Sequence, residues 1–511
     1  MTKVTSYASI TDARIQVEFE IVPDQQSHND PHPLFFMTAR IEKDMIGEKE
    51  LPIEAYYGIQ TLRALENFPI SGVPINFHPE LIRALAMVKQ AAALANEELG
   101  LLPSPLAGAI VAACREIMAG QLHDQFVVDR IQGGAGTSTN MNANEVIANR
   151  ALELLGHRKG EYRYCHPNNH VNESQSTNDV YPTAVRLALV FKSAQLANEL
   201  QALITSFELK AREFQHILKI GRTQLQDAVP MTLGQAFEAY AVTLSEEIAR
   251  LDQNTQLFLE VNMGATAIGT GINTDPEYAD KVIGHLAKIS GLKVVRAANL
   301  VEATQDTGAF IMFSSAVKRL AVKLSKICND LRLLSSGPRA GFNEINLPAV
   351  QPGSTIMPGK VNPVIPEVVN QIAFKVIGND LALNLAVEAG QLELNAFEPI
   401  MAQCLFESIG FLINGMNTLN HRCIVGITAN EDRCRELVEN SISLVTALSP
   451  LLGYEVCSML AKEALQSGNS VYQLVLTKGL MSAAELQQAL SPENMIHPRR
   501  RVSHDQKEPK N

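Results

Sequence analysis

The chain has 511 residues, of which 46% are apolar, and a formal net charge of −11 at pH 7. Its length exceeds what one hydrophobic core usually serves, so we expect two or three domains. The negative charge argues against nucleic acid as the main partner, because phosphate binding requires a positive surface, and no apolar run is long enough to span a membrane without including a charge.

The composition favours helices and a reducing compartment. The chain has no tryptophan, only 5% aromatic residues and a texture rich in alanine, leucine and glutamate, which favours helix over sheet. Its seven cysteines are an odd number without a C-x-x-C pair, so they indicate neither a disulfide framework nor a zinc site. We therefore expect a cytoplasmic protein with no metal site and with most cysteines in the core.

The two ends of the chain differ from the rest. Residues 1–36 mix polar residues with proline and lack the basic segment and long apolar segment of an export signal. We expect a poorly ordered N-terminal extension there, with no catalytic role. One basic cluster, residues 499–501, lies in a polar C-terminal tail, where a solvated end is the expected structure.

The first polar loop, residues 133–142, reads Gly-Gly-Ala-Gly-Thr-Ser-Thr-Asn-Met-Asn. Its glycines let backbone N–H groups approach an anion, and the hydroxyls of Thr137 and Ser138 add uncharged donors. The alternative is a simple cap of a helix that starts near Asn140. Taken alone, this loop favours the cap.

The second and third loops are also polar. Ser176, Thr177 and Asn178 precede a predicted helix whose dipole favours anions, although a capping box without any ligand explains them equally well. Thr223 and Gln224 belong to residues 221–230, another polar turn predicted to precede a long helix. Each loop is weak evidence by itself.

Very long helices are predicted between the loops. Residues 182–217, 230–261 and 366–398 each begin with a proline, which suits a first helical turn, and each would be about 45 Å long. Residues 313–334 carry apolar side chains in alternating steps of three and four, as in a helical bundle. The 366–398 helix is apolar on nearly every side, so we expect it to be buried all round by oligomeric packing.

The fourth loop, residues 353–363, reads Gly-Ser-Thr-Ile-Met-Pro-Gly-Lys-Val-Asn-Pro. It combines the hydroxyls of Ser354 and Thr355 with the cation Lys360 and the amide Asn362. This set offers a candidate base, a positive charge and a neutral anchor, and no acidic residue opposes an anionic substrate. The alternative for Ser354 is a solvated loop hydroxyl.

The fourth loop is similar, almost letter for letter, to the signature of the aspartase/fumarase superfamily, with Thr355 in place of a second serine. All four loops resemble the site loops of that superfamily in the same order, and the resemblance runs from about residue 40 to about residue 498. Residues 332–348 and 362–371 look like an aspartase, whereas fumarases more usually carry Thr-Gln-Cys-Glu after the Asn-Pro step. Gln224 stands where many relatives have histidine, so no histidine proton shuttle is assigned.

The resemblance implies a mainly α fold with three domains and a central long-helix bundle that contributes to a twenty-helix core in a homotetramer. Its domains would span residues 37–177, 178–432 and 433–511, after the extension at 1–36. Sites in this superfamily form from three subunits. No redox cofactor or catalytic metal is implied, and activation by Mg²⁺ stays open.

The implied reaction is the reversible elimination of ammonia from L-aspartate to give fumarate through an aci-carboxylate intermediate. Ser354 would be the base, with its alkoxide stabilised by loop N–H groups and Lys360. The implied substrate-binding residues comprise a β-carboxylate set (Thr137, Ser176, Thr177 and Thr355), an α-carboxylate set (Lys360, Asn362 and Thr223), the amine neighbours Asn178 and Gln224, and Ser138. The alternatives are a class II fumarase and an inactive structural homologue.

Overall fold

The computed structural model describes residues 9–10, 13–14 and 39–496. The predicted extension at 1–36 therefore lies outside the described residues, apart from the two-residue strands β1 (Ser9–Ile10) and β2 (Ala13–Arg14). The basic cluster at 499–501 also lies outside them. Helices make up 63% of the structure, which confirms the predicted mainly α class.

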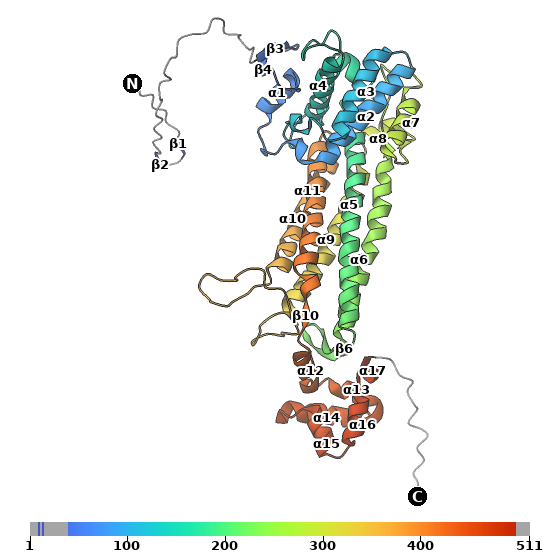
Figure 1. The fold of residues 1–511 in the computed structure, drawn as a ribbon. Coiled ribbons are helices and arrows are strands. Elements are labelled where there is room, and N and C mark those ends of the chain that lie inside the picture. Colours follow the sequence, from blue (N-terminus) through green and yellow to red (C-terminus); the bar gives the residue numbers. More distant parts are fainter. Residues whose placement is uncertain (1–8, 11–12, 15–38, 497–511) are drawn as a thin grey trace.

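One end of the molecule is formed by the N-terminal elements (Figure 1). An antiparallel hairpin of β3 (Ala39–Lys43) and β4 (Glu48–Pro52) precedes α1 (Ile59–Asn67). The helices α2 (Pro79–Glu98), α3 (Ser104–Met118) and α4 (Thr137–Leu154) follow. α2 and α3 are rich in alanine, and their small side chains let the two helices pack closely.

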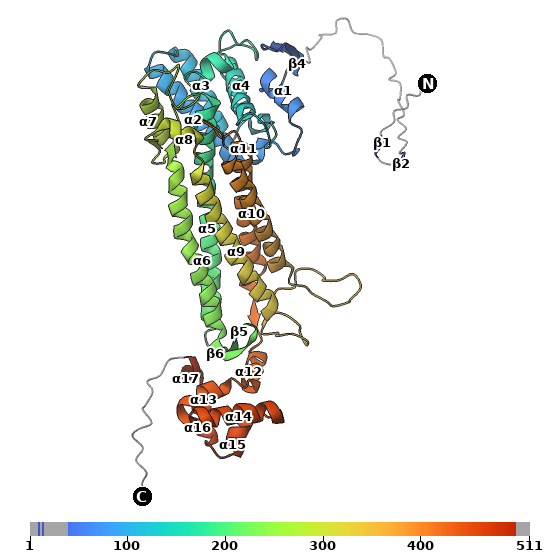
Figure 2. The same ribbon diagram turned by 180° about the vertical axis from the view of Figure 1, so that it is seen from behind.

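Five long helices form the central bundle and run along the molecule (Figures 1 and 2). They are α5 (Thr177–Glu213), α6 (Leu233–Thr255), α9 (Gly308–Leu334), α10 (Val364–Glu388) and α11 (Glu398–Arg422). The predicted apolar seam of α9 is buried, since Phe313, Leu320 and Leu324 are each 0% exposed. At 37 residues, α5 alone is about 55 Å long.

The predicted helix at 230–261 is wrong at its start. Pro230 belongs to β6 (Gln226–Thr232), which pairs with β5 (Leu218–Thr223) in an antiparallel hairpin. Its two-residue turn, Gln224 and Leu225, has φ of 51° and 63°. Such a turn normally carries Asn-Gly, so Gln-Leu at this place is a poor signal for a hairpin. The helix α6 begins only after a capping box of Thr232 and Gln235.

The other two helices also begin before the prolines that were predicted to start them. Pro182 lies inside α5, which already begins at Thr177. Pro366 is the third residue of α10, which ends at Glu388, ten residues before the predicted end.

A segment between α6 and α9 returns to the N-terminal end (Figure 1). It contains β7 (Glu260–Val261), which pairs in parallel with β8 (Val295–Arg296), and the helices α7 (Tyr278–Ser290) and α8 (Leu300–Gln305). α7 packs against α2. This segment covers the first turn of α5 and so contributes to the surroundings of the predicted site.

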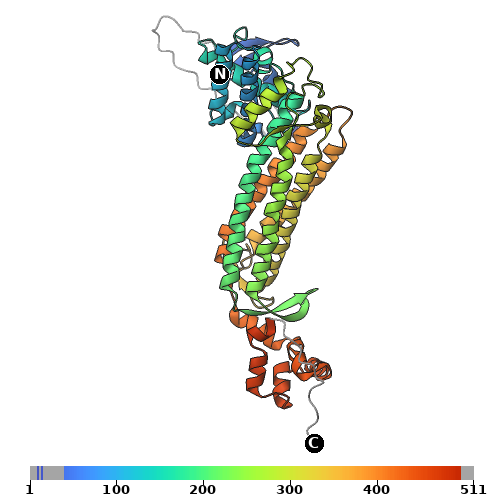
Figure 3. The ribbon, with the colours of Figure 1, turned by 90° about the vertical axis from the view of Figure 1, so that its right-hand side faces the viewer.

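The opposite end is a small group of helices with its own core (Figure 3). A short pair of β9 (Ile345–Asn346) and β10 (Thr428–Ala429) leads into it. Its helices are α12 (Glu431–Asn440), α13 (Leu444–Leu452), α14 (Tyr454–Ser467), α15 (Val471–Thr477), α16 (Ala483–Ala489) and α17 (Pro492–Ile496). All seven cysteines are buried and free, and their burial confirms the prediction that most of them belong to the core.

The helix α10 is not buried all round in the single chain, and its predicted burial by oligomeric packing stays a prediction. Phe374, Leu381 and Leu385 lie on one face of it and are 65%, 63% and 62% exposed. The opposite face packs against α9 and α11. Within the described part of the chain, no helix has both the length and the apolar character needed to cross a membrane.

Candidate functional site

The starts of α4 and α5 bring five predicted site residues together at the N-terminal end. We call Thr137, Ser138, Ser176, Thr177 and Asn178 the helix-start group. A Cβ on Gly136, just before α4, would lie 2.4 Å from the ring of Tyr181 in the first turns of α5, so only glycine allows this approach. The two loops therefore meet, as the resemblance implied.

Hydrogen bonds fix the helix-start group. The amide nitrogen of Asn140 donates to Thr177 Oγ1 at 3.1 Å and to Asn172 Oδ1 at 3.1 Å. Thr137 Oγ1 donates to Gly134 O at 2.8 Å, and Ser138 lines a cavity of about 530 Å³ next to α1. The group thus presents hydroxyls on a rigid frame.

The second loop forms a capping box at the start of α5, which was the alternative to ligand binding. Ser176 Oγ accepts from the Asn178 N–H, and the carboxylate of Asp179 accepts from the Ser176 N–H at 2.9 Å. The second oxygen of Asp179 accepts from the N–H groups of Gly264 and Thr266 at 3.1 and 3.0 Å. Burial raises the pKa of Asp179 to about 6. The carboxylate thus joins the start of α5 to the segment that covers it.

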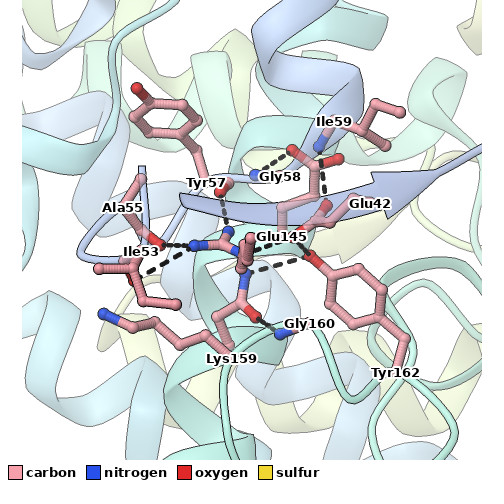
Figure 4. A network of polar contacts seen from close by, with 12 residues as sticks. Glu42, Ile53, Ala55, Tyr57, Gly58, Ile59, Glu145, Lys159, Gly160 and Tyr162 are labelled. Atoms are coloured by element: carbon pink, nitrogen blue, oxygen red, sulfur yellow. Dashed lines mark hydrogen bonds and ion pairs between the residues drawn. The ribbon is translucent and has the colours of Figure 1, made fainter. Parts of the chain in front are cut away.

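A buried network holds α4 against the N-terminal hairpin (Figure 4). Glu145, on α4, accepts from the N–H groups of Gly58 and Gln60 at 2.7 and 2.9 Å and so caps α1. Glu42 accepts from Tyr162 Oη at 2.9 Å, and Arg40 Nε donates to Glu42 at 2.8 Å. Burial raises the pKa of Glu145 to about 7, and the N–H groups that it accepts from oppose this shift.

The hairpin pair, Thr223 and Gln224, lies at the other end of the bundle and is exposed. Its base is anchored by Glu344, which is 0% exposed and lies 2.6 Å from Arg222 Nη1 and 3.3 Å from Lys219 Nζ. The left-handed backbone of Gln224 is strained for a residue with a side chain.

The fourth loop projects from the bundle between α9 and α10 (Figure 1). Ser354 Oγ accepts from the N–H groups of Ile356 and Met357 at 3.2 and 3.0 Å. The loop is closed at its base, where Asn362 Nδ2 donates to Gly353 O at 2.8 Å. The exposed Thr355 and Lys360 lie between these points.

The single chain does not assemble all eleven predicted site residues. The helix-start group lies at the start of α5, whereas the hairpin pair follows its end, about 55 Å away. Within the described part of the chain, no hydrogen bond joins the helix-start group, the hairpin pair and the fourth loop. The single chain therefore does not by itself form the complete site that the resemblance implies.

One residue that sequence reasoning missed lies beneath the helix-start group. Lys89, on α2, is 0% exposed, and its Nζ donates to Asn172 Oδ1 at 3.0 Å and to Gln175 Oε1 at 2.9 Å. Burial lowers its pKa to about 7. The sequence did contain one indication of Lys89, because it stands among apolar and alanine residues of a helical stretch. A lysine in such surroundings has few solvent-exposed positions for its charge.

Comparison with known proteins gives a consistent result. A family model described as Lyase matches residues 47–378, and one described as Fumarase C C-terminus matches residues 444–497. The chain is 62% identical to an aspartate ammonia-lyase of Pseudomonas canavaninivorans, over 90% of this chain and 97% of that protein. It is 55% identical to the aspartate ammonia-lyase of Escherichia coli K12, over 90% and 96%.

Solved structures agree in fold. A fumarate lyase:delta crystallin from Brucella melitensis superposes with a TM-score of 0.88 at 58% identity, over 90% of this chain and 100% of that chain. A class II fumarase from Schistosoma mansoni gives a TM-score of 0.84 at 33% identity, also over 90% and 100%.

Proposed function

The chain belongs to the aspartate ammonia-lyase family of the aspartase/fumarase superfamily and is a carbon–nitrogen lyase, and we propose that it reversibly eliminates ammonia from L-aspartate to give fumarate. The predicted family and fold class are thereby confirmed. The substrate and the roles of individual residues are our proposal.

The observation that carries the mechanism is the environment of Ser354. An unperturbed serine hydroxyl is far too weakly acidic to act as an alkoxide base. Two backbone N–H groups already point at its Oγ, from Ile356 and Met357, and hydrogen bonds to the charged form favour that form. Lys360, in the same loop, adds a positive charge. Ser354 then takes the proton from the carbon next to the β-carboxylate.

The charge left by this proton moves onto the β-carboxylate, which becomes an aci-carboxylate. Ser176 and Thr177 supply uncharged donors for it at the start of α5, where the helix dipole also favours negative charge. Thr137, at the start of α4, joins them when its hydroxyl turns away from Gly134 O. Thr355 completes this set, and Ser138 is a further substrate-binding residue. Collapse of the aci-carboxylate then expels ammonia and leaves fumarate.

The remaining residues hold the other end of the substrate. Lys360 and Asn362 bind the α-carboxylate with help from Thr223. Asn178 and Gln224 lie next to the amine; the amide of Asn178 donates to Ala267 O at 2.8 Å, so its oxygen is free to accept from an ammonium group.

The assembly that we propose is a cytoplasmic homotetramer with sites built from three subunits. It is supported by the separation of the helix-start group from the hairpin pair and by the exposed apolar face of α10. The proposal includes no required cofactor, no catalytic metal, no nucleic acid and no membrane partner, and activation by Mg²⁺ is left to experiment.

A class II fumarase is the second candidate. The family model that matches residues 444–497 is described as Fumarase C C-terminus, and one structural relative is a class II fumarase. Initial rates with L-aspartate and with L-malate, followed by fumarate absorbance, separate the two. We expect turnover of L-aspartate only. Turnover of L-malate alone would contradict the proposal.

The mechanism is tested with Ser354→Ala. We expect a folded tetramer whose turnover falls by at least about 10³, since the proton transfer has lost its base. Lys360→Ala is the comparison, and it should raise KM as well as lower turnover, because it removes a charge partner of the bound substrate. Retention of more than about a tenth of the wild-type turnover by Ser354→Ala would show that another group is the base.

A further inference from the structure

The ammonium group of Lys89 is buried without a carboxylate in direct contact, and the buried carboxyl group of Asp179 is the opposite charge that acts on it from a greater distance. Within the described residues, no carboxylate oxygen lies within 4.0 Å of its Nζ, and its two contacts are the amide oxygens of Asn172 and Gln175. A buried charge that is not paired is strongly unfavourable for folding. A fold that keeps such a charge therefore uses it for a purpose other than stability.

The contacts of Lys89 lead directly to the helix-start group. Asn172 Oδ1 accepts from Lys89, from Asn144 Nδ2 and from Asn140 Nδ2. Asn140 Nδ2 donates in turn to Thr177 Oγ1. Three contacts of 3.0, 3.1 and 3.1 Å therefore link the ammonium group to the hydroxyl, so the two are at most about 9 Å apart, within the range of an unscreened charge.

Donor and acceptor roles along this chain are fixed by the lysine. An ammonium group only donates, so Asn172 must turn its oxygen toward it. Asn140 must then present its nitrogen to that oxygen, and the same nitrogen donates to Thr177. Since Thr177 Oγ1 already accepts one hydrogen bond, its own hydrogen is left to donate outward.

We propose that Lys89 is a positioning residue of the elimination reaction, whose charge and donor-only character set the Asn172–Asn140–Thr177 chain to stabilise the aci-carboxylate. The inference rests on the proposed function, because it concerns the intermediate of that reaction. The charge matters more for the intermediate than for the substrate, since each β-oxygen gains negative charge as the proton leaves.

The test uses a ligand that needs no proton transfer. The nitronate form of 3-nitropropanoate has a planar group with two oxygens that each carry close to a full negative charge, as in the aci-carboxylate. Succinate carries an ordinary carboxylate at the same place. The measurement is the ratio of the two dissociation constants for the wild-type tetramer, Lys89→Met and Lys89→Gln.

In both variants we expect the preference for the nitronate over succinate to fall at least about thirtyfold, while the dissociation constant of succinate changes little. We also expect kcat to fall by a larger factor than KM changes. Lys89→Gln keeps an N–H donor for Asn172 without the charge, so it separates charge from hydrogen bonding and serves if Lys89→Met does not fold. A wild-type ratio in either folded variant overturns the proposal.

Ser354→Ala separates this inference from the proposed function. It should lose turnover and keep the wild-type ratio, because the nitronate has no proton for a base to remove. If Ser354→Ala retains turnover, the proposed base is wrong, while the ratios of the Lys89 variants still decide the role of Lys89.

Discussion

At the scale of single residues, several carboxyl groups in this chain are buried and hold raised pKa values. Glu398, the first residue of α11, is 6% exposed, and its pKa is raised to about 8 by burial, against a smaller opposing effect of Arg186. A carboxyl group of this kind favours the folded state only while it is protonated.

The pH dependence of stability follows from this shift. Between the ordinary pKa of 4.5 and about 8, the folded chain holds a proton on Glu398 that the unfolded chain has lost, so its contribution to stability is lost as pH rises through this range. We expect Glu398→Gln to gain stability relative to the wild type between pH 5 and pH 8, as measured by denaturant unfolding. If the free energies of unfolding of Glu398→Gln and the wild type differ by the same amount at pH 5 and at pH 8, Glu398 does not titrate in this range.

The candidate site residues could be named from the sequence, and their surroundings could not. Ser354, Lys360 and Asn362 were singled out because a match over so long a run of residues is highly specific, and their roles stay a prediction. Lys89 was missed because its role depends on burial by elements distant in sequence, such as Asn172. The capping of α5 by Ser176 and Asp179 was predicted as an alternative to binding, and the structure shows that the same turn is a cap.

At the scale of elements, the bundle helices were predicted by their periodicity, and their ends were not. Proline was a poor marker here, because Pro230 lies in a strand and Pro182 inside a helix. The sequence could not distinguish the exposed face of α10, which we call the α10 stripe, from its buried face, because the side chains on both faces are apolar. An apolar surface of this extent on a long helix supports the proposed contact with another copy of the chain.

The α10 stripe predicts an effect on assembly. Leu381→Glu places a charge on a side chain that is 63% exposed in the single chain, so the subunit should fold while the tetramer dissociates and activity is lost. Light scattering and circular dichroism measure the two effects. Leu465→Glu on α14, where the leucine is 71% exposed, is the matched control and should leave the assembly intact. A tetrameric, active Leu381→Glu protein would place the interface elsewhere.

At the scale of the whole molecule, the length of α5 separates the predicted site residues. Thr177 begins α5, and the fourth loop lies at the opposite end of the bundle (Figures 1 and 2). Under the proposed mechanism, the hydroxyls for the β-carboxylate and Ser354 would therefore come from different subunits. The sequence order of the four loops could not show this, because loop spacing does not give the direction of the helices between them.

Mixing two inactive variants tests this central claim most directly. Thr177→Ala and Ser354→Ala subunits, dissociated and reassembled together, should form some sites with both wild-type residues and regain about a quarter of the wild-type activity, as random assembly of symmetric sites gives. Ser354→Ala mixed with the double variant Thr177→Ala/Ser354→Ala is the control and should stay inactive. If mixed tetramers form and no activity returns, the two residues act within one subunit, and the shared site proposed here is contradicted.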